Sequence, residues 1–298
     1  MTKPLHFLIF CASLYSLVSG CGGSDSPNAN GTSDPGAENI DPTSRPGIRD
    51  IADRPQQQLV NCETIRAVIR DFRGWDELDA NGSRIGHPDF ERFGAATNVP
   101  TIGLVAPQLG PDNKPVYADN DNVPKPNGPQ TTNAANFNQW YRDVPGVNMR
   151  FEIQLPLVST APTDGVATIV YDNPNYFPLT GQGFGDRLVD GQLNNFHFTT
   201  EIATSFSYDP SKNLVFTFTG DDDLWIFVNG RLALDRGGHC NSVYGPCTGS
   251  IDFNAQAAAL GLQPNQTYEM RIFHAERHTN KSQFRIETNI QCFANGLI

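Results

Sequence analysis

The chain has 298 residues, which is enough for one large β domain or two ordinary domains. Charged residues make up only 18% and aromatic residues 10%, while Gly and Pro number 27 and 22, a mixture typical of an all-β, extracellular type of domain rather than a helical enzyme. The balance is acidic, with 32 Asp and Glu against 21 Lys and Arg, and no basic patch interleaved with aromatic residues occurs, so nucleic acid is not an expected partner.

The N-terminus has the features of an export signal. Lys3 precedes an apolar run that is too short to span a bilayer, which predicts a signal peptide over residues 1–20. Residues 17–21 read Leu-Val-Ser-Gly-Cys and resemble a bacterial lipobox, which implies cleavage before Cys21 and diacylation of its thiol. Gly22 gives no inner-membrane retention signal, so an outer-membrane or cell-surface location is expected, with the lipid as the only membrane contact. The alternative is an ordinary signal peptide that contains a cysteine.

Residues 21–56 are expected to form a lipidated, flexible tether. This stretch is rich in Gly, Ser, Asn, Asp and Pro, and it cannot bury enough apolar area to offset the entropy lost on ordering. Residues 57–298 then form the folded domain. A lipid anchor followed by a spacer holds such a domain away from the membrane and indicates an outward-facing task.

Four cysteines remain once the signal peptide and the lipid site are set aside. An even number in an exported chain indicates disulfides, with three possible connectivities. We predict that Cys240 pairs with Cys247 across a short turn and that Cys62 pairs with Cys292 near the two ends of the domain. A zinc site is the alternative, although six intervening residues between two cysteines is not a common ligand spacing.

The domain shows the periodicity of strands rather than of long helices. A short helix is expected at 136–143, and a helical turn at 255–260 that Gly261 ends. The glycines of 181–185 are interpreted as turns and not as a phosphate loop. Strands are expected at 63–73, 148–157, 166–171, 195–208, 216–235 (a hairpin), 268–273 and 283–290. Eight to twelve strands with long loops and one or two short helices predict an all-β fold of the β-sandwich or jelly-roll type.

The hairpin at 216–235 carries the strongest local signals. Asn229-Gly230 lies between two apolar strands and predicts a type I′ turn, because both central positions need positive φ. Residues 224–228 are apolar on both faces, which predicts a central strand between two layers. Asp221, Asp222 and Asp223 precede that strand, and three adjacent carboxylates repel one another unless they are solvated, hydrogen-bonded or bound to a cation.

Several motifs together resemble the fibro-slime domain over most of residues 60–292, and the segment 220–235 is the most specific of them. The motifs lie at 69–72, 87–90, 140–148, 220–235 and 273–278. That family occurs in surface and secreted proteins of bacteria and slime moulds and is related to the protective-antigen-type lectin domains. The relation implies a β-sandwich in which two adjacent Asp residues, joined by a cis peptide, hold a calcium ion that helps to bind sugar hydroxyls.

By this resemblance, either Asp221 with Asp222 or Asp222 with Asp223 is expected to bind calcium. No counterpart of the second, ligand-selecting loop of the lectins is recognisable in the sequence. The alternative is that one Asp caps the hairpin through backbone N–H groups while the others face solvent.

A second candidate metal motif is His274-x-Glu276-x-His278. On a strand these three side chains share one face and could gather two imidazoles and a carboxylate around zinc. The alternative is structural, with Glu276 and Arg277 pairing or capping beside the acidic turn. No nucleophile elbow or comparable arrangement occurs, so the sequence predicts no enzymatic activity.

The sequence therefore predicts a cell-surface lipoprotein whose β-sandwich binds polysaccharide or a cell-surface glycan, assisted by calcium, in adhesion or matrix function. Trp140 and Tyr141 are weak candidates for stacking on sugar faces, with a place in the core as their alternative. Two other functions stay open: a structural component of the extracellular matrix without a small ligand, and a carbohydrate-active hydrolase.

Overall fold

The computed structural model describes residues 60–93, 101–118, 129–160, 167–239 and 248–298, which belong to one compact unit, Pro55–Ile298. The signal peptide, Cys21, the tether and the predicted Cys240–Cys247 disulfide lie outside the described residues. Within the part of the chain that is described, no helix is both long and apolar enough to cross a bilayer.

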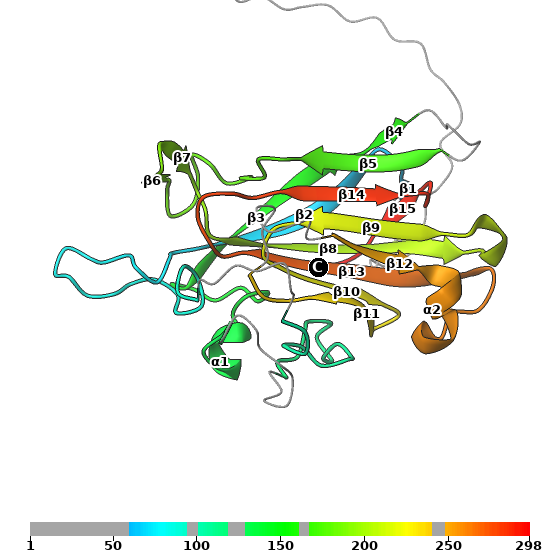
Figure 1. Cartoon of the computed structure of the whole chain (residues 1–298), viewed down its shortest axis with the longest axis horizontal. Helices are drawn as coiled ribbons and strands as arrows, with labels where there is room; N and C mark the ends of the chain where they lie inside the picture. The colour runs from blue at the N-terminus through cyan, green and yellow to red at the C-terminus, as the bar shows by residue number, and fades with distance from the viewer. Residues whose placement is uncertain (1–59, 94–100, 119–128, 161–166, 240–247) are drawn as a thin grey trace, which may run out of the picture. The chain divides into compact units, whose positions relative to one another are not determined.

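Two antiparallel sheets build the fold (Figure 1). The larger sheet has the order β3 (Asn148–Pro156), β2 (Thr64–Phe72), β8 (Phe198–Tyr208), β13 (Gln266–Glu276), β10 (Asp223–Val228) and β11 (Arg231–Arg236), and the short strands β15 (Phe293–Asn295) and β1 (Val60–Asn61) continue from β8 beside β2. The smaller sheet has the order β12 (Thr248–Asp252), β9 (Val215–Gly220), β14 (Phe284–Thr288), β5 (Thr168–Asn173) and β4 (Val158–Thr160). The strands β6 (Arg187–Val189) and β7 (Gln192–Asn194) pair only with each other.

The main core lies between the two sheets. Ile202, Ile226 and Ile272 come from the larger sheet, and Phe218 and Phe284 come from the smaller one. All five side chains are buried, and alternate residues of each strand point into this layer. The prediction of an all-β sandwich is confirmed by these antiparallel sheets.

A second apolar layer covers the outer face of the larger sheet. Trp225 and Phe273 point out of β10 and β13 into it, and Phe90, Phe137 and Trp140 close over them from loops and from the short helix α1 (Ala134–Phe137). Every residue of β10 is therefore buried, which confirms the prediction that this strand is central between two layers.

Trp140 and Tyr141 belong to this second layer, with exposures of 0% and 1%. Side chains buried to this extent cannot stack on a sugar. The prediction that they bind sugar faces is wrong, and their alternative place in the core is correct. The helix expected at 136–143 is also shorter and earlier, because Asn133 caps it by accepting a hydrogen bond from the backbone N–H of Asn136.

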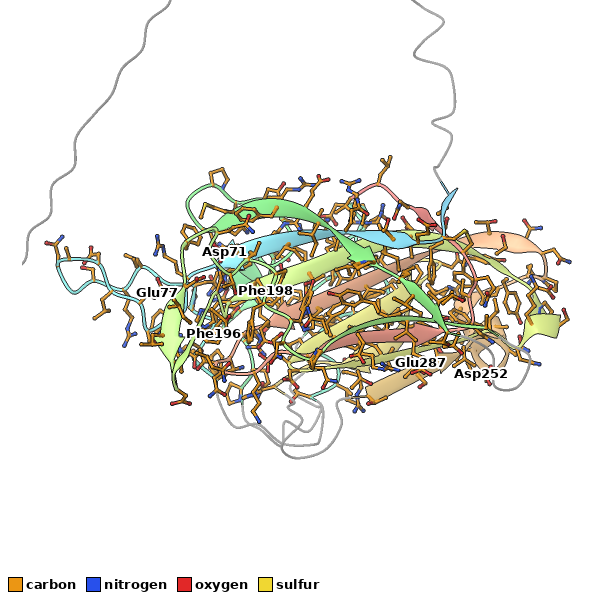
Figure 2. The ribbon with its side chains drawn as sticks, turned by 90° about the horizontal axis from the view of Figure 1, so that it is seen from above. Asp71, Glu77, Phe196, Phe198, Asp252 and Glu287 are labelled. Carbon is orange, nitrogen blue, oxygen red and sulfur yellow. A yellow bond between two sulfur atoms is a disulfide. The ribbon has the colours of Figure 1, made fainter. Side chains whose placement is uncertain are left out.

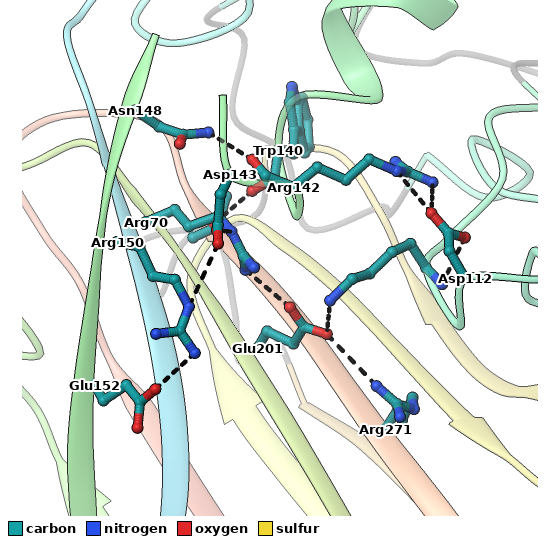
Figure 3. A network of polar contacts seen from close by, with 12 residues as sticks. Arg70, Asp112, Trp140, Arg142, Asp143, Asn148, Arg150, Glu152, Glu201 and Arg271 are labelled. Atoms are coloured by element: carbon teal, nitrogen blue, oxygen red, sulfur yellow. Dashed lines mark hydrogen bonds and ion pairs between the residues drawn. The ribbon is translucent and has the colours of Figure 1, made fainter. Parts of the chain in front are cut away.

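Charge pairing fixes a covering loop to the same face (Figure 3). Glu201 on β8 is fully buried and accepts a hydrogen bond from Arg70 Nη1 at 2.8 Å. It also pairs with Lys114, from the loop 101–118, and with Arg271 on β13. A buried carboxylate with three cationic neighbours keeps its charge compensated, so the loop is held by ionic as well as apolar contacts.

The predicted turns are found. Asn229 and Gly230 have φ values of 52° and 71° between β10 and β11, as a type I′ turn requires. Gly261, with φ 70°, ends the helix α2 (Phe253–Leu260). Gly181, Gly183 and Gly185 all have positive φ, so this stretch is a series of turns.

The first and last strands, β1 and β15, meet at one end of the sandwich (Figure 1). Cys62 and Cys292 form a disulfide, which confirms that predicted pair, and β1 pairs with β15 through Val60 and Ala294. The β6–β7 hairpin lies at the opposite end of the strands (Figure 1). The view from above agrees, with Phe196 and Phe198 near that end and Asp252 near the other (Figure 2).

Candidate cation and ligand site

The three adjacent Asp residues lie where the chain passes from the smaller sheet to the larger one, between β9 and β10. Asp222 makes the change of direction possible with a φ of 54°, in the left-handed region that Asp tolerates better than most residues. Asp221, Asp222 and Asp223 are only 3%, 3% and 0% exposed. The alternative in which two of them face solvent is therefore wrong.

Asp223 is part of a buried ion pair. Its Oδ2 accepts a hydrogen bond from Arg277 Nε at 2.5 Å, and its Oδ1 accepts one from the Gly238 backbone N–H at 2.6 Å. Arg277 is itself fully buried and lies over the ring of Trp140 at 4.9 Å. Both oxygens of Asp223 are thus engaged in holding β10 to the residues that follow β13 and β11.

Asp222 lies among two imidazoles. Its Oδ2 accepts hydrogen bonds from the Arg277 backbone N–H at 2.7 Å and from His278 Nδ1 at 3.0 Å, and its Oδ1 lies 3.5 Å from His239 Nε2. Burial opposes ionisation of Asp222, but His278 and His239 outweigh it and hold the pKa of this carboxyl below its usual range. The two imidazole rings stack with centroids 3.9 Å apart.

Glu276 adds a second carboxyl beside Asp222. It is 1% exposed, and its Oε2 has no hydrogen-bond partner. Burial, followed by the neighbouring charges of Asp222 and Asp221, raises the pKa of Glu276 well above its usual value. A small cavity of about 90 Å³ is lined by Asp221, Asp222, His239, Glu276, His278 and the segment 279–281.

The His274-x-Glu276-x-His278 motif does not come together as predicted. His274 points into the main core, where its ring lies 5.3 Å from that of Phe284, and burial lowers its pKa to about 4. β13 ends at Glu276, so His278 lies past the strand, where it lines the same small cavity as Glu276. His239, which the sequence analysis missed, takes the place of His274 because the chain after β11 returns to this edge.

These residues do not fit the calcium site expected from the resemblance. Calcium takes six to eight oxygen ligands, whereas two imidazoles face Asp222 here and Asp223 is engaged by Arg277. The cis peptide of the described residues joins Thr279 to Asn280 and not two of the Asp residues.

A larger hollow of about 330 Å³ lies next to the small cavity and shares Asp221, Asn280 and Lys281 with it. Side-chain amides dominate its wall. The other lining residues are Pro174, Asn175, Gln192 and Gln283. Asn280 Nδ2 donates a hydrogen bond to Asp190 Oδ2 at 2.7 Å, which fixes the turn of the β6–β7 hairpin at the rim.

Comparisons with known proteins point to one family for this part of the chain. Residues 185–293 match the PA14 domain. Two relatives from Dictyostelium discoideum are protein psiR, 35% identical over 68% of this chain and 20% of psiR, and protein psiD, 34% identical over 63% of this chain and 36% of psiD. The chain thus spans 20% and 36% of the lengths of these two relatives.

A solved structure described as the PA14 sugar-binding domain from an RTX adhesin aligns with 78% of this chain and 99% of its own, at 9% identity and a TM-score of 0.28. The small cavity and the hollow both draw most of their lining from residues 185–293. The part of this chain that carries both features is therefore related to the PA14 domain.

Proposed function

We propose that this protein is a cell-surface polysaccharide-binding or adhesion module, and that the larger hollow beside Asp221 receives the sugar. The observation that carries the proposal is the composition of the hollow, whose polar lining consists of four amide residues, one carboxylate and one lysine: Asn175, Gln192, Asn280, Gln283, Asp221 and Lys281. Amide groups donate and accept hydrogen bonds, as sugar hydroxyls do. A volume of about 330 Å³ is within the usual range for small-ligand sites.

The relationship to PA14 domains supports the same class of ligand. Five of the seven lining residues, all except Pro174 and Asn175, fall within the matched residues 185–293. A solved domain of this kind is described as sugar-binding, which agrees with the proposal for this chain. Membership of the fibro-slime family is the finer form of this proposal.

Binding to an array of bacterial and plant polysaccharides tests the proposal with the full chain. Asn175→Ala and Gln192→Ala remove exposed amides of the hollow, and each is expected to weaken binding about three- to tenfold, the value of one or two hydrogen bonds. Gln154→Ala is the matched control, because it removes an exposed amide of β3 that does not line the hollow. Equal losses in all three variants would contradict the assignment of the hollow.

Calcium dependence of this binding is a separate proposal with its own outcome. Protein freed of metal by a chelator is compared on the same array with and without added Ca²⁺. Loss of binding that Ca²⁺ alone restores would support the calcium-assisted form. Unchanged binding would mean that the module binds polysaccharide without calcium. Release of reducing sugar from any bound polysaccharide would mean that the protein is a carbohydrate-active hydrolase and not only a binding module.

The proposed location is the outer membrane or cell surface, through a lipid on Cys21. The Cys62–Cys292 disulfide is consistent with an oxidising compartment outside the cytoplasm. Cys21→Ser is expected to release the protein from membranes into the soluble fraction. Membrane retention and normal processing of this variant would contradict the lipid anchor.

A further inference from the structure

We propose that Asp222, His239 and His278, completed by Glu276, form a binding site for a transition-metal ion of the zinc class. Asp222, His239 and His278 each offer one ligand atom, and these three atoms all lie within 4.8 Å of one another. They come from three separate parts of the fold: the β9–β10 junction, the segment after β11 and the segment after β13. The site does not depend on whether the neighbouring hollow binds sugar.

Buried polar atoms at the cavity point to a missing ligand. Glu276 Oε2 and His278 Nε2 are buried and have no hydrogen-bond partner, and Glu276 is 1% exposed. Leaving a buried acceptor without a partner costs about 1–3 kcal/mol, more for a charged group. Both residues line the same cavity of about 90 Å³, which has room for an ion.

The charges around the cavity also favour a cation. Arg277, whose backbone N–H donates to Asp222, carries a buried positive charge that the ion pair with Asp223 neutralises. Asp222 and Glu276 remain as buried carboxyls, and the cationic side chain that lines the cavity, Lys281, is exposed. A divalent ion could engage both carboxyl groups at once.

The donor set selects the class of ion. Two imidazole nitrogens and the carboxylate oxygen of Asp222, with Glu276 lining the same cavity as the proposed fourth donor, suit the tetrahedral coordination of Zn²⁺. Zinc binds His at about 2.0–2.1 Å and carboxylate oxygen at about 2.0–2.2 Å. Calcium prefers oxygen alone and a larger number of ligands. The site is therefore expected to bind Zn²⁺ or Co²⁺ in preference to Ca²⁺.

Binding requires a small rearrangement that can be observed. The rings of His239 and His278 are nearly parallel, at 6°, with centroids 3.9 Å apart. A metal ion lies in the plane of each imidazole that binds it, so two stacked rings cannot share one ion until one of them tilts. The histidine NMR signals of both residues should shift together when Zn²⁺ is added.

The experiment titrates metal-free full chain with Zn²⁺, Co²⁺ and Ca²⁺. We expect one Zn²⁺ per chain, a tetrahedral Co²⁺ absorption spectrum that Zn²⁺ abolishes, and no competition from Ca²⁺. Loss of a residue that only hydrogen-bonds to a metal ligand lowers metal affinity about 10- to 100-fold. His239→Gln and His278→Gln each remove a ligand and should lower Zn²⁺ affinity by more than that. His87→Gln is the control, because it alters a buried histidine that does not line the cavity.

A further variant keeps the test decisive if a glutamine variant fails to fold. His278→Cys retains a ligand and should add a sulfur-to-cobalt charge-transfer band, which appears only if residue 278 contacts the ion. Stoichiometric Zn²⁺ binding that none of these substitutions alters would overturn the proposal. Binding of Ca²⁺ in place of Zn²⁺ would overturn it as well, whatever the outcome of the polysaccharide array.

Discussion

The contact between Gly183 and Asp71 shows how closely one residue can determine a loop. Asp71 Oδ2 accepts a hydrogen bond from the Phe184 backbone N–H at 2.5 Å, and its Oδ1 accepts one from Asn195 Nδ2 at 2.8 Å. A Cβ atom on Gly183 would lie 2.0 Å from Asp71 Oδ2. The glycine is therefore required both for its φ of 65° and for the space it leaves.

Gly183→Ala is expected to lower the free energy of unfolding by more than about 1 kcal/mol, because the new methyl group displaces the Asp71 carboxylate and the φ is strained. Urea unfolding followed by fluorescence measures the change. Gly181→Ala is the control, since Gly181 has a φ of 80° but no atom within 4 Å of an added Cβ. Equal losses in the two variants would show that the contact with Asp71 does not matter.

Asp71 also predicts a pH dependence of stability. Burial raises the pKa of this carboxyl to about 6, against the usual value near 4. The folded state then holds a proton that the unfolded state has lost, so the free energy of unfolding should fall as the pH rises from about 4 to 6, by up to about 3 kcal/mol. Asp71→Asn should flatten this part of the pH profile, and a profile of unchanged slope would contradict the assignment.

The group formed by Asp222, His239 and His278 could be predicted only in part from the sequence. The structural alternative placed Glu276 and Arg277 beside the acidic turn, and the structure pairs Arg277 with Asp223 and brings Glu276 to the cavity that Asp222 lines. His239 was not predicted, because its position depends on the path of the chain after β11. Periodicity also included His274, which shares a face of β13 with Glu276 but lies deeper between the sheets, beside the ring of Phe284 and the backbone carbonyl of Asp221.

At the scale of elements, the Asp223–Arg277 ion pair joins β10 to the segment after β13. Both side chains are fully buried. Asp223→Ala should cost about 3–5 kcal/mol of stability, because it leaves the Arg277 charge buried and unpaired. Asp172→Ala is the comparison, since it breaks the half-exposed Arg285 pair and should cost less than about 1 kcal/mol.

Chemical unfolding of these two variants and of the double variant Asp223→Leu/Arg277→Met measures the coupling. The double variant should recover part of the loss, because no charge is left buried without its partner. A cost for Asp223→Ala no greater than that for Asp172→Ala would contradict a stabilising role of the buried pair.

Elements with a strong local pattern were predictable. The β10–β11 hairpin follows from its Asn-Gly turn, and the central place of β10 follows from its two apolar faces. The apolar layer that covers the larger sheet was not predictable, because Trp140 and Tyr141 pack on the outer face of a sheet that only the tertiary structure defines. Aromatic residues in a loop look the same in sequence whether they cover a core or bind a sugar.

At the scale of the whole molecule, the Cys62–Cys292 disulfide closes a loop with a sequence separation of 230 residues. Cys62→Ser with Cys292→Ser is expected to lower the free energy of unfolding by about 2–5 kcal/mol, chiefly by enlarging the unfolded ensemble. The urea midpoint of the double variant should fall below that of the oxidised wild type, because both proteins keep the predicted Cys240–Cys247 bridge and differ only in the Cys62–Cys292 bridge. If the double variant unfolded at the same urea concentration as the oxidised wild type, the Cys62–Cys292 bridge would add nothing to stability.

The disulfide also has a mechanical consequence. β1 and Cys62 lie at one end of the sandwich, and the β6–β7 hairpin at the rim of the hollow lies at the other (Figure 1). Tension between the preceding chain and a ligand held in the hollow would run along the strands, so many interstrand hydrogen bonds would resist it together in shear. The covalent link to Cys292 passes that load from β1 to the β15 side of the sheet, and the two-residue strand β1 need not bear it alone.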